Sequence, residues 1–126
     1  MRAVDTNVLV RLLTRDDIPQ TRSAETFIAK GAWVSILALA EAVWVLDSVY
    51  ELSSIDQAKA IEMLLSHRQL SIQDPETVAA AVVLFRVKPS LGFSDCLMLE
   101  MARKSGHLPL GSFDRNLGKI NGAQTL

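Results

Sequence analysis

Asp5 lies where a short apolar segment ends and a second apolar segment begins. The first segment predicts a strand over residues 2–4, and the second predicts a helix that starts directly after it. In open parallel α/β sheets, ligands bind at the carboxyl ends of the strands. Asp5 is therefore a candidate ligand-binding residue. The structural alternative is that Asp5 or Thr6 only caps the helix, since both residue types are preferred caps.

Two further aspartates occur at comparable places. Asp114 follows an apolar segment that predicts a strand over residues 108–113, and Asp95 opens a helix predicted to run to Lys104. Each has an ordinary structural interpretation as well. Asp114 fits a polar turn, and an acid in the first turn of a helix complements the helix dipole.

Glu41 is harder to explain structurally. It lies within a predicted helix, capped by Ser35 and running to about Val49, that is apolar nearly all round. Helices of that composition are buried, and a buried carboxylate is costly unless it is paired, protonated or bound to a metal. The sequence therefore predicts a functional partner for Glu41. The alternative is a narrow solvent-facing stripe that passes through Glu41 and Asp47.

The elements that must position these acids follow from short apolar runs that alternate with helical patterns. About six helices are expected, with one capping box in which Ser54 is the cap and Gln57 the third residue, and another helix capped by Ser94. The strands are predicted over residues 2–4, 32–34, 70–72, 108–113 and, as a short fifth, 123–126. This alternation predicts an α/β fold, a three-layer α/β/α sandwich with a four- to five-stranded, mainly parallel sheet.

Composition limits the classes of protein that are possible. The 126 residues, 49% hydrophobic and 21% charged, predict one globular domain over residues 1–126. A single cysteine, Cys96, fits a cytoplasmic protein, and His67 and His107 lack zinc-site spacing. The most apolar segment, residues 33–46, is too short to span a membrane. With a net charge of −1, a polyanionic substrate would need a local feature to hold it.

The predicted topology brings the four acids to one side of the sheet, where strand ends and helix starts meet. Four converging carboxylates repel one another at pH 7 unless cations neutralise them. Oxygen ligands without His or Cys select hard ions, so the expected cofactor is Mg²⁺ or Mn²⁺.

The same residues carry a resemblance to a known family. Val4-Asp5-Thr6-Asn7, Glu41 in its apolar helix, Phe93-Ser94-Asp95 and the segment from Ser112 to Leu117 resemble, in order and spacing, the motifs of the PIN domain. The spacing and small size resemble its VapC-type toxin branch. The resemblance implies a catalytic and metal-binding set supported by polar neighbours, with Ser112 where Thr is usual. The acids are Asp5, Glu41, Asp95 and Asp114, and the supporting residues are Thr6, Asn7 and Ser112.

The resemblance implies a metal-dependent endoribonuclease that hydrolyses RNA with one or two Mg²⁺ or Mn²⁺ ions, as the toxin of a toxin–antitoxin pair. VapC-type proteins form homodimers and are held inactive by a VapB-like antitoxin, so these are the implied partners. One alternative is a PIN-fold nuclease of RNA processing outside a toxin system. Another is a receiver-type phosphoacceptor domain, which needs an adjacent acid pair that Asp5-Thr6 lacks. A third is a binding module with a degenerate site, against which the retention of all four acids argues.

Overall fold

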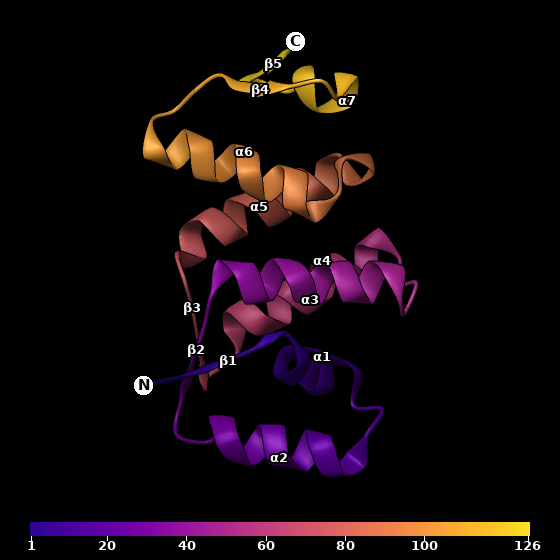
Figure 1. The fold of residues 1–126 in the computed structure, drawn as a ribbon, viewed down its shortest axis with the longest axis vertical. Helices are drawn as coiled ribbons and strands as arrows, with labels where there is room; N and C mark the ends of the chain where they lie inside the picture. Colours follow the sequence, from indigo (N-terminus) through magenta and orange to yellow (C-terminus); the bar gives the residue numbers. More distant parts are fainter. The chain divides into compact units, whose positions relative to one another are not determined.

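The α/β class predicted from the sequence is confirmed by seven α-helices and five strands, which form parallel sheets (Figure 1). The structure is a computed structural model that describes residues 1–126. The chain divides into two compact units, Met1–Pro75 and Glu76–Leu126, and each unit has a parallel sheet of its own.

The first unit is built on three parallel strands in the order β1-β2-β3. Val34 of the central strand pairs with Val4 on one side and Ile72 on the other, so the three strands are in register. Their carboxyl ends therefore share one edge, which Asp5 and Ser35 follow directly. The sequence pattern predicts all three strands with their observed limits: β1 (Arg2–Val4), β2 (Ala32–Val34) and β3 (Leu70–Ile72).

Four helices cover these strands. In Figure 1, α2 lies on one side of the strands and α3 with α4 on the other, and α1 packs against both α2 and α3. Large aliphatic side chains at the centre, such as Leu9, Leu39 and Ile61, are fully buried. The helices are α1 (Thr6–Thr14), α2 (Ile18–Ile28), α3 (Ile36–Ser48) and α4 (Ser54–Ser66).

The second unit contains two long helices, followed by two parallel strands that are joined by a short helix. The ring of Phe85 meets that of Phe93 edge to face, with centroids 6.1 Å apart, and so fixes where α5 and α6 meet. In β4 and β5, Leu110 pairs in parallel with Ala123. The elements are α5 (Pro75–Val87), the 3₁₀ turn η1 (Pro89–Leu91), α6 (Phe93–Ser105), β4 (Leu110–Ser112), α7 (Arg115–Gly118) and β5 (Ala123–Thr125).

Gly118 allows α7 to lie close to β5. A Cβ atom at Gly118 would lie 2.9 Å from the backbone nitrogen of Thr125 and would also overlap its side chain. Any other residue would therefore push α7, and the Asp114 that begins it, away from the strand.

Two predicted helix starts are wrong by one or two residues. The cap of α4 is Ser53 rather than Ser54, because Ser53 is extended and its Oγ accepts from the Asp56 N–H at 3.1 Å. The cap of α6 is Gly92 rather than Ser94. Gly92 has a φ of 79°, a conformation that glycine adopts readily, and the helix then begins at the buried Phe93.

The prediction that α3 is buried nearly all round is also wrong. Its small and aliphatic residues, such as Ala38 and Leu39, are buried, but Leu37 and Trp44 are 69% and 63% exposed. Glu41 lies between these two positions and is itself exposed. The solvent-facing stripe that was the structural alternative for Glu41 therefore exists, and it is apolar on both sides of the carboxylate.

No helix of the chain combines the length and the apolar character needed to cross a membrane.

The two faces of α3 make a matched test. Leu39→Ala is expected to lower the free energy of unfolding by about 2–5 kcal/mol, because it opens a cavity at a fully buried position. Leu37→Ala, two residues away in the same helix, is expected to change it by less than about 0.5 kcal/mol. Urea unfolding followed by circular dichroism measures both. Equal destabilisation by the two variants would contradict the exposed face.

Candidate active site

Asp5 joins β1 to α1 and is the cap of that helix. Its backbone is extended, and its Oδ1 accepts from the Val8 N–H at 3.2 Å. Thr6 is not the cap, because it is already the first residue of the helix. The cap occupies one carboxylate oxygen only, and Oδ2 of the exposed Asp5 accepts no hydrogen bond. Capping the helix and offering an oxygen to a ligand are therefore compatible.

Thr6 connects this junction to Glu41. The Thr6 hydroxyl donates to Oε2 of Glu41 at 3.0 Å, and it also lies 3.5 Å from the carbonyl oxygen of Ala38. Glu41 is thus held beside the start of α1 although 36 residues separate it from Asp5 in the sequence. The structure brings Asp5, Thr6 and Glu41 together within the first unit, as the resemblance implied.

The start of α3 is fixed by two side chains. Oγ of Ser35 accepts from the Ala38 N–H at 3.0 Å, which confirms the predicted cap. Oε1 of Gln73, just beyond β3, accepts from the Ile36 N–H at 2.9 Å. Gln73 thereby anchors the helix that carries Glu41. Sequence reasoning missed it, since nothing local marks a glutamine that acts on a helix 37 residues away.

Asn7 lies apart from this hydrogen-bonded group. Its side chain makes no hydrogen bond to Asp5 or Glu41 and instead lines a recess shared with Arg11, Gln20 and other residues of α1 and α2. No hydrogen bond in this structure supports the role that the resemblance implies for Asn7.

Asp114 repeats in the second unit what Asp5 does in the first. It caps α7, and its Oδ1 accepts from the N–H groups of Asn116 and Leu117 at 2.8 and 3.1 Å. Oγ of Ser112 accepts from the Asp114 N–H at 3.0 Å and so fixes the backbone between β4 and the cap. Oδ2 of Asp114 accepts no hydrogen bond, so Asp114 also keeps one oxygen for a ligand.

Asp95 is affected both by burial and by a neighbouring negative charge. It is the third residue of α6, half-buried, and its side chain accepts no hydrogen bond. Loss of solvent raises the pKa of Asp95 above its ordinary value, and the negative charge of Asp114 raises it further. Asp95 and Asp114 are therefore close enough to repel each other, which brings two of the predicted acids together in the second unit.

The chemistry of these residues fits a hard divalent cation. Neither unit gathers three or more His, Cys, Asp or Glu side chains that could hold a metal ion. Mg²⁺, however, usually takes only one or two carboxylates and completes its octahedral shell with water and substrate phosphate. Asp95 and Asp114 supply such a pair, and a cation beside them would relieve their repulsion. Asp5 and Glu41 supply a second pair of oxygen ligands.

Comparison with protein families identifies the family of the chain. The family profile described as PIN domain matches residues 2–123. The chain belongs to the PIN domain family. The PIN domain is a metal-dependent nuclease fold that acts on nucleic acid, and membership excludes the receiver-type alternative. The comparison with curated proteins gives no match.

The PIN match runs through both units and includes all four acids. Asp5 and Glu41 lie in its first part, and Asp95 and Asp114 in its second. Asp5 is the helix cap that its structural interpretation predicted, and Asp114 caps α7 where a polar turn was the alternative. Neither cap excludes a role as a ligand.

The raised pKa of Asp95 predicts a stabilising effect of Asp95→Asn in the metal-free PIN domain. A carboxyl whose folded pKa is raised favours folding when protonated, below its ordinary value of 3.8, and that contribution is lost as the pH rises through the folded pKa. At pH 7 the ionised Asp95 therefore opposes folding. Asp95→Asn is expected to raise the melting temperature at pH 7 in the presence of chelator.

Asp56→Asn is the matched control, since Asp56 is the third residue of α4 as Asp95 is of α6. It is expected to lower the melting temperature slightly or leave it unchanged, because it removes an acid that complements the helix dipole. Thermal unfolding by circular dichroism at pH 7 compares the two. A fall in melting temperature for Asp95→Asn would contradict the repulsion.

Proposed function

We propose that this PIN domain is a metal-dependent endoribonuclease in which Asp5, Glu41, Asp95 and Asp114 act together. The observation that carries the proposal is the repelling pair of Asp95 and Asp114, because Asp95 is a half-buried carboxylate without a hydrogen-bond donor. Such a group costs stability unless a cation accompanies it. We treat residues 1–126 as one functional domain, since the family match runs through both units.

The roles of the residues follow from their contacts. Asp5 and Asp114 each use one oxygen to cap a helix, which leaves the other oxygen oriented by the cap. Thr6 holds Glu41 through Oε2, and Ser112 holds the backbone that carries Asp114. Bound Mg²⁺ or Mn²⁺, as one or two ions, supplies a water of lowered pKa and stabilises the charge that develops on the phosphate.

No side chain of this set is needed as a nucleophile. The protein orients the attacking water and the phosphodiester, and the carboxylates keep the site selective for hard cations. Beside these acids, a chain with net charge −1 would need the positive charge of bound cations in order to accept RNA.

Loss of one acid from either pair is expected to abolish cleavage. Asp5→Asn or Asp95→Asn should lower the rate of RNA hydrolysis by at least about 100-fold, because each removes a carboxylate that would hold the metal ion, and the ion stabilises the charge of the transition state. Chelator should do the same to the unmodified protein. Cleavage of a fluorescent RNA in Mg²⁺ or Mn²⁺ measures the rate, with Asp56→Asn as the control that should keep full activity.

The same proteins separate a nuclease from a degenerate binding module. Millimolar Mn²⁺ should raise the melting temperature of the unmodified protein and of Asp56→Asn, and should raise that of Asp95→Asn less, because only the native state binds the ion. Undiminished cleavage by either acid variant would mean a different mechanism. An unmodified protein that neither cleaves RNA nor responds to metal would be a binding module.

We further propose that this nuclease is the toxin of a toxin–antitoxin pair, a homodimer whose partner is a VapB-like antitoxin. The support is the resemblance of its short chain and motif spacing to the VapC-type branch. A PIN nuclease of RNA processing outside a toxin system is the competing proposal, and it shares the same acids and cofactor.

Induced expression in a bacterial host distinguishes the two. The unmodified chain should arrest growth and Asp5→Asn should not, because a toxin acts through cleavage of cellular RNA. Growth curves after induction measure this, and sequencing of RNA ends identifies the target. Unimpaired growth with abundant, active protein would favour RNA processing, and a monomer in sedimentation would contradict the homodimer.

A further inference from the structure

Arg2 and Phe27 form a flat cationic surface in the first unit. The guanidinium carbon of Arg2 lies 3.9 Å from the centroid of the Phe27 ring, and Nη2 of Arg2 donates to the carbonyl oxygen of Phe27 at 3.1 Å. The hydrogen bond holds the guanidinium over the ring, which preorganises the stack. Nothing in the nuclease mechanism uses this pair.

Phe27 lines two recesses on the surface of α2. One recess, of about 420 Å³, is lined also by Arg2 and Arg22. The other, of about 490 Å³, is lined also by Arg11 and by Asn7, which lies two residues after Asp5. Ser23 and Phe27 line both recesses, so the two recesses adjoin on α2, and the second one reaches Asn7 in the first turn of α1.

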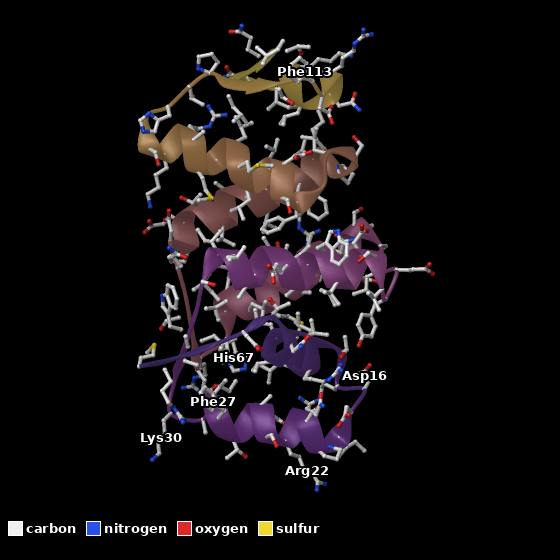
Figure 2. All side chains as sticks on the ribbon, viewed as in Figure 1. Asp16, Arg22, Phe27, Lys30, His67 and Phe113 are labelled. Atoms are coloured by element: carbon white, nitrogen blue, oxygen red, sulfur yellow. The ribbon has the colours of Figure 1, made fainter.

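The charges on and around α2, near these recesses, are unbalanced. Arg2, Arg22 and Lys30 take part in no ion pair, and Figure 2 shows Arg22 and Lys30 extending away from the body of the unit. The one acid within α2, Glu25, is paired with Arg15 at 3.3 Å. A chain with net charge −1 thus carries an uncompensated positive surface here.

We propose that this surface, called here the α2 surface and made of Arg2, Arg22, Phe27 and Lys30, binds single-stranded RNA. One base stacks on the Arg2–Phe27 pair, and Arg22 and Lys30 contact the phosphates. Stacking on aromatic rings and guanidinium planes combined with a positive groove is the usual means of holding a single strand. The inference rests on the proposed function, because it assumes that the substrate is RNA.

The position of the α2 surface suits a strand that extends to Asp5. Arg2 and Asp5 are three residues apart along β1 and its end, or roughly 10 Å at the rise of an extended chain. That is about the length of three stacked nucleotides. An acidic protein segment could use the cations but would gain little from the flat stack, which is why we favour RNA.

Binding of a fluorescein-labelled single-stranded RNA, measured by anisotropy in chelator, tests the charges without any cleavage. The double variant Arg22→Gln/Lys30→Gln should raise the Kd about tenfold at low salt. It should also reduce the slope of log affinity against log salt by about 1.4, since each phosphate contact on a single strand contributes about 0.7. Both side chains are exposed, so the fold should not change.

Lys59→Gln is the control, compared with the single variant Arg22→Gln. It removes one positive charge from the first unit, as Arg22→Gln does, at an exposed residue of α4 that lines neither recess. Its Kd should change by less than about twofold, as expected for a charge that makes no phosphate contact. An equal loss in Lys59→Gln and Arg22→Gln would mean that only the net charge matters and would overturn the α2 surface as a site.

Substitutions at the stack test the base contact. Phe27→Leu should raise the Kd about fivefold or more and leave the salt slope unchanged, because stacking does not depend on ionic strength as phosphate contacts do. Arg2→Lys keeps the charge but removes the planar guanidinium group, so it should also raise the Kd. Phe27→Tyr keeps an aromatic ring and should bind RNA with the Kd of the unmodified protein. Circular dichroism verifies that each variant is folded, and Arg2→Lys carries the test should Phe27→Leu unfold.

The outcomes separate this inference from the nuclease proposal. If the protein binds RNA through the α2 surface but never cleaves it, the nuclease proposal fails and this inference stands. If the protein cleaves RNA but the α2 variants bind unchanged, only this inference fails. Absence of binding at low salt would overturn it. So would binding of polyglutamate as tightly as RNA with no effect of Phe27→Leu, which would assign the surface to an acidic protein segment.

Discussion

A carboxylate at the junction of a strand and a helix can serve the fold and the chemistry together, because it has two oxygens. Asp5 and Asp114 both use Oδ1 to accept backbone N–H groups at a helix start, and neither uses Oδ2 in a hydrogen bond. The cap fixes the side chain, so the second oxygen is presented in a defined direction. The candidate site depends on this double use, since the same hydrogen bonds that start α1 and α7 orient Asp5 and Asp114.

Asp95 and Glu41, the two acids that cap no helix, lie in different surroundings. Asp95 is half-buried without a donor and is repelled by Asp114, so its ionised form opposes folding of the metal-free protein. Glu41 avoids that cost, because it lies in solvent and accepts from Thr6. A cation beside Asp95 would remove this unfavourable interaction, and its relief would contribute to the affinity for the cation.

Sequence patterns predicted the local elements of this chain well. The strands β1, β2 and β3 have the predicted limits, and the cap at Ser35 is confirmed, since each depends on neighbouring residues only. The burial of Glu41 was predicted wrongly, because the composition of a helix does not reveal which side its neighbours cover. Gln73 and the Arg2–Phe27 pair were missed for the same reason: their partners lie 37 and 25 residues away.

The distribution of charge explains how a nearly neutral chain can handle a polyanion. Asp5 and Asp114 lie at the ends of strands, whereas the cations Arg2, Arg22 and Lys30, which form no ion pair, lie on and around α2. A surface with one sign of charge raises the local concentration of an oppositely charged ligand even when the net charge is small. Cations at the acids would extend that positive field to the place of cleavage, so metal binding and RNA binding would favour each other. If both proposals hold, the metal-free protein would bind RNA at α2 while its acids repel the strand, so the substrate would be bound without being positioned for hydrolysis.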